Sequence, residues 1–306
     1  MICIGESIHI ISQNVRIAVE KRDKAVIQGL AKDQAAKGAT YLDLNIGPQK
    51  KAGHEVMPWM VQTVQEVSDL PLSLDTTNPV AMEAGLKVCK KTPLINSTDS
   101  TPQRLTALMP LAAKYNANII ALTYAGGGLP TSADARCELA AERIFPAAAE
   151  NGVPTNRIFL DPLVLTINGN QDQAQHTINA VRFFKQMADP APLTTCGMSN
   201  VSNSCPAEIR PLLNRVFLVM MMGAGLDSAI IDCLDHEIME TIRMVESRNT
   251  STPKGKLFVA LWDAYVTGEQ FDTGSVDKSN PELKDIAKTI DVMQNKVLYA
   301  HSYLKT

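Results

Sequence analysis

Short apolar runs alternate with longer stretches of helical periodicity along most of the chain. Two of these runs, residues 72–75 and 93–96, end on Asp75 and Asn96, and small polar residues follow each of them at once. Both runs are short and are bounded by turn-forming residues, which favours strands over buried helix. A carboxylate and a carboxamide at the ends of two successive buried strands would point into one common space.

The same unit recurs about eight times. We expect strands at residues 2–5, 41–48, 72–75, 93–96, 118–123, 157–162, 193–197 and 227–231. Helical spacing of apolar residues predicts helices near 15–37, 54–68, 79–90, 102–115, 133–150, 171–187, 206–222 and 235–248. Gly38 should end the first helix, Asn78 should cap the third, and Ser100 or Thr101 the fourth. This repeat predicts an α/β fold, a (β/α)8 TIM barrel over residues 1–248.

The last part of the chain has a different pattern. Residues 249–255 are polar and rich in turn formers, and apolar clusters follow at 257–262 and 286–304. We interpret residues 249–306 as a C-terminal helical extension, packed on the barrel or on the partner subunit of a homodimer, and not as a separate domain.

Composition narrows the classes of function. Of the 306 residues 45% are hydrophobic and 20% charged, and the net charge is −3, so no global field attracts nucleic acid or an anionic membrane. No signal peptide and no membrane-spanning run is apparent. The six cysteines are scattered without a C-x-x-C pair, and the five histidines form no recognisable cluster. We therefore expect reduced thiols in the cytoplasm and no metal site.

Polar side chains gather at the expected strand ends, with almost no Lys or Arg among them. In such a barrel these ends surround the active site. A rim of carboxylates and carboxamides does not suit a phosphate, but it suits a neutral heterocycle rich in N–H donors. The strand-end residues are Glu6, Asp43 or Asn45, Asp75, Asn96, Thr123, Asp161, Asn200 and Asp232.

Structural roles compete with this interpretation. Asp75 and Asp232 can cap the helices that follow them, Asn96 can cap a loop, and Asp161 precedes a proline in a typical turn-starting pair. We expect only one of Asp43 and Asn45 to face the barrel interior. His9, in the first loop, is a weaker candidate for substrate contact. The recurrence of polar residues at one edge carries the argument.

Short motifs at these strand ends give a more specific indication. In chain order they are Gly5-Glu6, Leu42-Asp43-Leu44-Asn45-Ile46-Gly47, Leu74-Asp75-Thr76-Thr77-Asn78, Ile95-Asn96-Ser97, Leu160-Asp161-Pro162-Leu163, Gly197-Met198-Ser199-Asn200-Val201-Ser202 and Arg210-Pro211-Leu212-Leu213-Asn214-Arg215. With this set the chain resembles, over residues 1–248, the pterin-binding TIM-barrel methyltransferases. These enzymes move a methyl group between N5 of tetrahydrofolate and the cobalt of a protein-bound corrinoid.

The resemblance implies roles for individual residues. Asp75, Asn96 and Asp161 would hold the amino-pyrimidinone edge of the pterin, and Asn200 would be catalytic, reaching N5. Further pterin or folate contacts implied by the resemblance are Glu6, Asn45, Gly197, Ser199 and Arg210, the last of these offsetting the charge of the p-aminobenzoyl-glutamate arm.

The substrates implied are tetrahydrofolate or 5-methyltetrahydrofolate and a corrinoid (cobalamin) carried by a partner protein, because the chain has no Asp-x-His-x-x-Gly cobalamin signature.

The chain also departs from the family. Its first strand has Ser7 and His9 after Gly5-Glu6 where Gly-Glu-Arg is common, the spacing from Cys205 to Arg210 is long, and the extension after 249 is unusual. These features favour an enzyme that takes the methyl group from a methylated corrinoid protein, with glycine betaine or an aryl methyl ether as the original donor. One alternative is the methyltetrahydrofolate:corrinoid/iron-sulfur protein methyltransferase of the acetyl-CoA pathway.

Three other readings are less well supported. A dihydropteroate synthase-like enzyme would need basic strand ends for the leaving pyrophosphate. A barrel that binds folate without transferring anything would not need Asn200. A Schiff-base aldolase would need a strand-end Lys.

Overall fold

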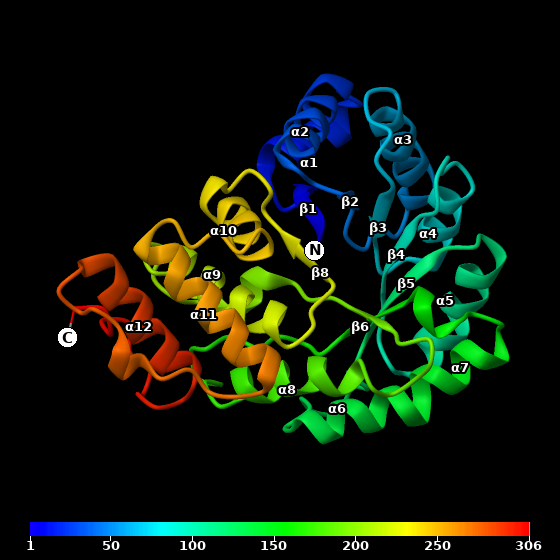
Figure 1. Ribbon diagram of the computed structural model, residues 1–306. Coiled ribbons are helices and arrows are strands. Elements are labelled where there is room, and N and C mark those ends of the chain that lie inside the picture. Colours follow the sequence, from blue (N-terminus) through cyan, green and yellow to red (C-terminus); the bar gives the residue numbers. More distant parts are fainter. Residues whose placement is uncertain (306) are drawn as a thin grey trace.

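Eight parallel strands form the centre of the protein (Figure 1), which we describe from a computed structural model that covers residues 1–305. The sheet order is β7-β6-β5-β4-β3-β2-β1-β8, and every hydrogen-bonded pair of strands is parallel. The predicted (β/α)8 barrel is therefore confirmed. The strands are β1 Ile2–His9, β2 Tyr41–Asn45, β3 Leu72–Asp75, β4 Leu94–Thr98, β5 Asn118–Leu122, β6 Ile158–Asp161, β7 Leu193–Thr194 and β8 Ser228–Ile231.

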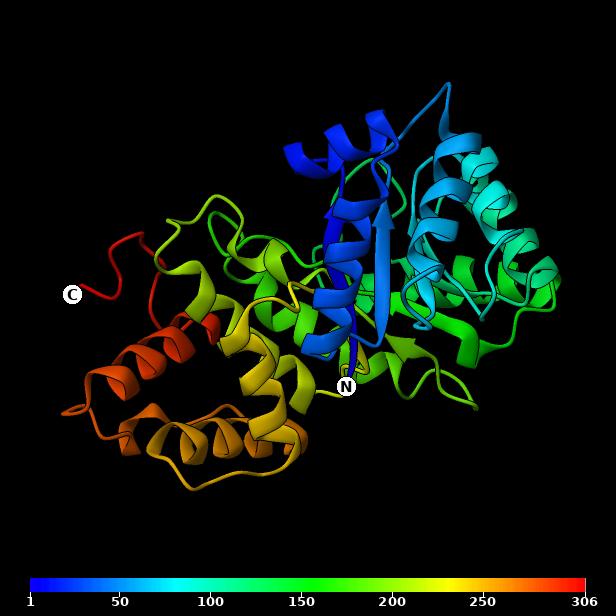
Figure 2. The ribbon, with the colours of Figure 1, turned by 90° about the horizontal axis from the view of Figure 1, so that it is seen from above.

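Helices cover the outside of this sheet (Figures 1 and 2). They are α1 Gln13–Lys21, α2 Lys24–Lys37, α3 Gly53–Gln65, α4 Pro79–Leu86, α5 Pro102–Lys114, α6 Ala133–Leu139, α7 Phe145–Glu150, α8 Gln173–Phe184, α9 Arg210–Gly223, α10 His236–Glu246, α11 Pro253–Thr267 and α12 Pro281–Met293. Two predicted helix ends are confirmed. Gly38 ends α2 in the left-handed conformation, and the Asn78 side chain accepts hydrogen bonds from the first free N–H groups of α4.

Several predicted boundaries were wrong. The single helix expected over 15–37 is two helices, because Arg22 adopts a left-handed conformation and Asp23 then caps α2. The helix expected over 133–150 contains a π-helical turn at residues 140–144 between α6 and α7. The first strand does not stop at Glu6 but continues to His9, and β4 passes through Asn96 to Thr98.

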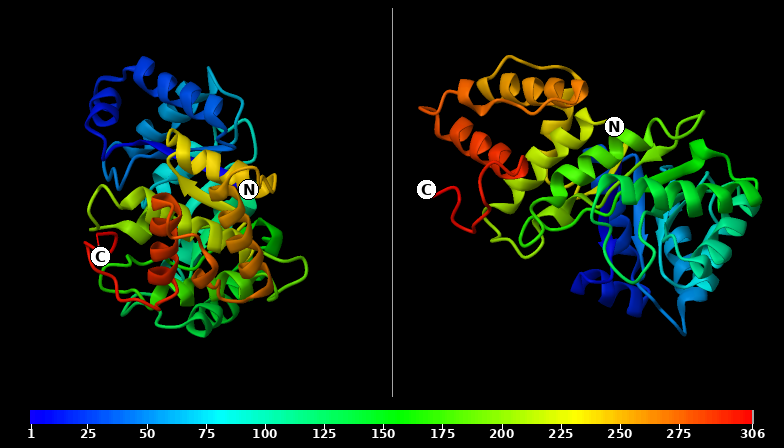
Figure 3. Two further views of the ribbon diagram at one scale, coloured as in Figure 1. Left: turned by 60° about the vertical axis from the view of Figure 1, so that its left-hand side comes forward. Right: turned by 90° about the horizontal axis from the view of Figure 1, so that it is seen from below.

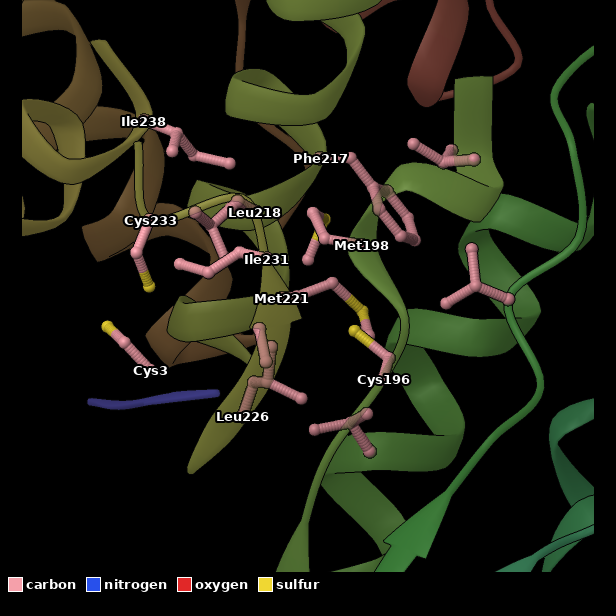
Figure 4. Close-up of a cluster of buried hydrophobic side chains, with 14 of the residues drawn as sticks. Cys3, Cys196, Met198, Phe217, Leu218, Met221, Leu226, Ile231, Cys233 and Ile238 are labelled. Carbon is pink, nitrogen blue, oxygen red and sulfur yellow. The ribbon is translucent and has the colours of Figure 1, made fainter. Parts of the chain in front are cut away.

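The seam between β7 and β8 is closed mainly by side chains. One isolated bridge joins Gly197 to Ile230, and the Asp227 carboxylate accepts a hydrogen bond of 2.8 Å from the Thr194 N–H. Figure 4 shows the apolar layer behind this seam, where Phe217, Leu218 and Met221 of α9 lie against the ends of the two strands. The short β7 therefore depends on α9 packing for its place in the barrel.

The C-terminal helices lie against one side of the barrel. Both α11 and α12 contact α9, and α11 also contacts α10 (Figure 3). Among residues 1–305, no helix is both long and apolar enough to cross a bilayer.

Candidate active site

Strand register brings the polar strand ends into one row. Across β2, β3 and β4, Asn45 is the direct neighbour of Asp75, and Asp75 is the direct neighbour of Asn96. The row borders a cavity of about 400 Å³ at the carboxyl ends of the strands. Its lining comprises Glu6, His9, Ile11, Asp43, Asn45, Asp75, Asn96, Ser97, Leu122, Asp161, Gly197, Ser199, Asn200 and Ile230.

Asp43 and Asn45 both line this cavity, so the expectation that only one of them faces inward was wrong. Side chains alternate along a strand with a period of two, which places residues 43 and 45 on the same face. Asp43 lies deeper, and its Oδ1 accepts hydrogen bonds from Ser73 Oγ at 2.6 Å and Asn96 Nδ2 at 3.0 Å. Asp43 therefore holds Asn96 from behind.

Asn45 is occupied by its neighbours. Its Nδ2 donates a short hydrogen bond to Asp75 Oδ2, and its Oδ1 accepts from the Gly47 N–H at 2.9 Å. Asn45 thus orients the Asp75 carboxylate and leaves the other oxygen of Asp75 toward the cavity. Asp75 does not cap the next helix, since Asn78 has that role.

Asp161 is fixed by the turn that follows it. Its Oδ1 accepts the Leu163 N–H at 2.7 Å, and the fully buried Arg136 donates from Nε to the Pro162 carbonyl at 2.6 Å. The turn-forming role considered for Asp161 is real, yet the carboxylate also lines the cavity. Thr123 is buried, and its hydroxyl donates to the Asp161 carbonyl at 3.0 Å, so this candidate is structural.

Asn200 belongs to a 3-10 turn, Met198–Ser202, just after β7. Its backbone N–H donates to the Gly197 carbonyl, and a Cβ placed on Gly197 would meet Asn200 Nδ2 at 3.0 Å. The φ of Gly197, −76°, is open to any residue. This glycine therefore provides space for the Asn200 side chain, and the backbone conformation does not require it.

Two candidates lie next to the main cavity. Arg210 and Asp232 line an adjoining cavity of about 310 Å³, which shares Glu6 and Ser199 with the first. Arg210 Nε donates to Ser202 Oγ at 3.2 Å. Asp232 is not the cap of α10, because Asp235 is; it accepts hydrogen bonds from Ser7 Oγ and the Leu234 N–H.

Burial shifts the carboxyl groups of the site toward the neutral form. Burial raises the pKa of Asp161 to about 7, although the Leu163 N–H and the Arg136 charge oppose the rise. It also raises the pKa of Glu6 to about 7, with Asp232 and Asp43 adding to the effect. For Asp75, burial and the nearby Asp43 raise the pKa, and burial raises that of Asp43 as well.

Sequence reasoning missed four lining residues and one support. Ile11, Ser97, Leu122 and Ile230 line the cavity, and Arg136 braces the Asp161 turn from α6. Ser97 and Leu122 adjoin strand ends already noted, but nothing in the sequence pattern pointed to Arg136. Within residues 1–305, no cluster of three or more His, Cys, Asp or Glu side chains is arranged to hold a metal ion.

The cavity presents a set of hydrogen-bond acceptors. Within residues 1–305, one side-chain oxygen of each of Asp75, Asn96 and Asp161 accepts no hydrogen bond. The other side-chain polar atoms of these residues are held by Asn45, Asp43 and Leu163, respectively. Such a set complements a flat heterocyclic edge with several N–H donors. Fold and site together define a pterin-binding TIM-barrel enzyme.

The chain belongs to the pterin binding enzyme family, whose model matches residues 13–232. It is 31% identical over 244 residues to the methylcorrinoid:tetrahydrofolate methyltransferase of Eubacterium limosum, covering 79% of this chain and 89% of that protein. It is also 32% identical over 241 residues to the methionine synthase of Mycobacterium leprae. That alignment covers 76% of this chain and 20% of the synthase.

Among solved structures, the fold is similar to dihydropteroate synthases. A dihydropteroate synthetase crystal structure gives a TM-score of 0.58 at 16% identity, covering 82% of this chain and 94% of that one. The Yersinia pestis dihydropteroate synthase gives 0.55 at 18% identity, covering 82% and 93%. At these identities the likeness establishes the fold.

Proposed function

We propose that this enzyme transfers a methyl group from the cobalt of a methylated corrinoid protein to N5 of tetrahydrofolate, forming 5-methyltetrahydrofolate. The observation that carries the proposal is the set of free acceptor oxygens on Asp75, Asn96 and Asp161 around one cavity. The similarity to a methylcorrinoid:tetrahydrofolate methyltransferase over 79% of the chain supports the same reaction. The original methyl donor in this proposal is a small demethylated compound such as glycine betaine or an aryl methyl ether.

In this proposal the acceptors hold the pterin by its amino-pyrimidinone edge. The free carboxylate oxygens of Asp75 and Asp161 each accept an N–H bond from such an edge, and the Asn96 carbonyl accepts one more. Gly197 and Ser199 line the ring, and Glu6 stands between the pterin cavity and the adjoining one. Arg210, in the adjoining cavity, offsets the charge of the p-aminobenzoyl-glutamate arm.

Asn200 is the catalytic residue in this proposal. N5 of tetrahydrofolate attacks the methyl carbon, the Co–C electron pair stays on cobalt, and the N5 proton passes to solvent as the new N–C bond forms. A neutral carboxamide accepts from the N5–H before transfer and donates to N5 in the reverse direction, without trapping N5 as a cation. The barrel contributes mostly by positioning, since two large substrates must meet in line.

A pyrophosphate-expelling reaction, as the dihydropteroate synthase alternative requires, fits the site less well. The residues of 1–305 that line the pterin cavity include no Lys or Arg. A leaving pyrophosphate needs fixed positive charge around it. The likeness to dihydropteroate synthases therefore supports the fold and not their reaction.

Three features of the wider setting belong to the proposal. The barrel of residues 1–248 forms one unit with the extension 249–306, and the enzyme works as a homodimer in the cytoplasm. The thiols of all six cysteines are free, which supports a reducing compartment. The contacts of α11 and α12 with α9 support the extension as part of the barrel domain.

The test is spectroscopic. Purified enzyme is mixed with methylcob(III)alamin or a methylated corrinoid protein, with and without tetrahydrofolate, and cobalt demethylation is followed by absorbance. We expect demethylation only with tetrahydrofolate present and 5-methyltetrahydrofolate as the product. Absence of demethylation with every corrinoid source, despite folate binding, would refute the proposed reaction.

A further inference from the structure

The C-terminal tail, residues 294–305, lies beside two loops at the carboxyl ends of the strands (Figure 2). One loop, residues 162–172, follows β6 and Asp161. The other, residues 195–209, follows β7 and carries Asn200. The tail lies beyond residue 232, where the match to the family ends, so family membership does not account for it.

Gln171 fastens the tail to the first loop. This buried side chain donates from Nε2 to the Val292 carbonyl at 2.9 Å and to the Val297 carbonyl at 2.6 Å. Its Oε1 accepts the Tyr299 N–H at 2.7 Å. The Gln171 amide therefore makes three hydrogen bonds to the end of α12 and the tail. Gln171 itself belongs to the loop that follows Asp161 of the site.

The tail also reaches the second loop. Burial, together with the neighbouring Cys205, raises the pKa of Tyr299 well above its usual value. Cys205 is itself 9% exposed, and its N–H donates to the Ser202 carbonyl at the end of the turn that holds Asn200. Tyr303, four residues further along the tail, shares a hydrogen bond of 2.8 Å with Thr289 of α12. Tyr299 thus packs against the buried apolar cluster that contains Cys205, three residues after the Asn200 turn.

The two loops are joined to each other close to Asn200. The Ile167 N–H donates to the Val201 carbonyl at 2.8 Å, and the Thr166 hydroxyl donates to the Asn203 carbonyl. The segment 199–205 is therefore held from one side by the loop that Gln171 anchors and from another by Tyr299 next to Cys205. Any loosening of the tail would therefore move the Asn200 turn through both of these contacts.

We propose that the C-terminal tail, held by Gln171 and Tyr299, positions the Asn200 turn for methyl transfer. The inference rests on the catalytic role proposed for Asn200 above. Gln171 and Tyr299 are positioning residues, because they act through the loops and do not line the pterin cavity. The acceptors Asp75 and Asn96 lie on other strands, and Asp161 is held by the Leu163 N–H at the opposite end of the loop from Gln171. We therefore expect the tail to affect turnover far more than folate binding.

Gln171→Leu tests this role against a matched control, Gln175→Leu. Gln175 donates to the Met293 carbonyl and to the Tyr265 hydroxyl, so it also holds the C-terminal helices, but it lies on α8 and outside the loop. We expect Gln171→Leu to lower kcat about tenfold while the KM for tetrahydrofolate changes by less than about twofold, since a small misplacement of a reacting group costs this much. Gln175→Leu should leave both constants at the level of the wild type. Equal losses of kcat in the two variants, or an unchanged kcat in Gln171→Leu, would overturn the inference.

A double-mutant cycle links the effect to Asn200. If Gln171 acts through Asn200, adding Gln171→Leu to the Asn200→Ala variant should cost no further activity. A full further loss would overturn the inference. Wild-type turnover in Asn200→Ala alone would instead refute the catalytic role of Asn200 in the proposed function, so the two failures are distinguishable.

A second readout does not depend on activity. Alkylation of Cys205, followed by peptide mapping, should accelerate in Gln171→Leu and in Tyr299→Leu, because both variants loosen the tail over this buried thiol. It should not accelerate in Gln175→Leu. Unchanged alkylation in both tail variants would show that the tail does not hold the turn.

Discussion

Asn96 donates its side-chain N–H to the buried carboxylate of Asp43 across 3.0 Å. This bond decides which atom Asn96 presents to the cavity, because the amide nitrogen is committed and the carbonyl oxygen is left for the ligand. Asp43, which lies deeper than Asn96, therefore determines that Asn96 offers an acceptor and not a donor to the pterin.

Asp43→Asn should weaken tetrahydrofolate binding although Asp43 is not a proposed pterin contact. The new amide oxygen still accepts from Asn96, but a bond to a charged group, worth about 1.5–3 kcal/mol, becomes a neutral bond worth about 0.5–1.5 kcal/mol. This difference corresponds to roughly fivefold to tenfold in Kd. The measurement is isothermal titration calorimetry. Ser73→Ala is the control, since it removes the other partner of Asp43 Oδ1 and leaves the Asn96 bond in place. A Ser73→Ala effect as large as that of Asp43→Asn would show that the bond from Asn96 is not the contact through which Asp43 acts.

Asp75→Ala should largely abolish folate binding, because it removes the acceptor carboxylate that lies between Asn45 and Asn96. Asn45→Ala should cost less, since Asn45 orients Asp75 and its own polar atoms are already occupied. We expect a loss of at least about 100-fold for Asp75→Ala and about tenfold for Asn45→Ala. Equilibrium titration by fluorescence or calorimetry ranks the two variants. Micromolar affinity retained by Asp75→Ala would contradict the assignment of the pocket.

The strand ends were predictable because parallel strands in a barrel share one polarity. The alternation of apolar runs and helices located Asp75, Asn96 and Asp161 at one mouth, and the register of β2, β3 and β4 places Asn45, Asp75 and Asn96 in one row. The family motifs pointed to Asn200, whose role the structure leaves as a proposal.

Other features depend on contacts between residues far apart in the chain. The bond from Asp43 to Asn96 spans 53 positions, and the bond from Gln171 to Val297 spans 126. Neither leaves a periodic signal in the sequence. Arg136 reads as an ordinary charged residue of a surface helix, and only its burial against the Pro162 carbonyl reveals its place behind Asp161.

Gly197→Ala should reduce turnover with little loss of folding stability. The φ of Gly197 suits alanine, so the backbone is not strained, but the new methyl group would press on Asn200 Nδ2 at 3.0 Å and turn that side chain away. Asn200→Ala should lower kcat by roughly 100-fold or more, and Gly197→Ala should fall between that variant and the wild type. Steady-state kinetics with thermal melts separates the two effects. Wild-type kcat in Gly197→Ala would show that Asn200 does not need this space.

Folate binding should release protons near neutral pH. Burial raises the pKa of Asp161 to about 7 in the free protein, so below that pH the carboxyl group holds a proton that it must lose to accept the pterin N–H groups. The raised pKa of Asp161 also makes the stability of the folded protein depend on pH. The neutral carboxyl group of Asp161 contributes to the stability of the folded protein. This contribution is complete below the unfolded pKa of about 4 and is lost as the pH rises through about 7.

Affinity for tetrahydrofolate should therefore rise at least about tenfold between pH 6 and pH 8, as Asp161 with its pKa near 7 becomes ionised. Asp75, whose pKa is also raised by burial and by Asp43, adds to this rise. Calorimetry at pH 6.5 in two buffers of different ionisation enthalpy measures the protons released. Asp161→Asn should bind more weakly and keep only the part of the pH dependence that Asp75 contributes. Glu6→Gln is the comparison. Burial raises the pKa of Glu6 to the same range, but Glu6 lines both cavities and is not one of the three acceptors. Proton uptake on binding, or the same pH profile in Asp161→Asn as in the wild type, would exclude Asp161 as the titrating acceptor.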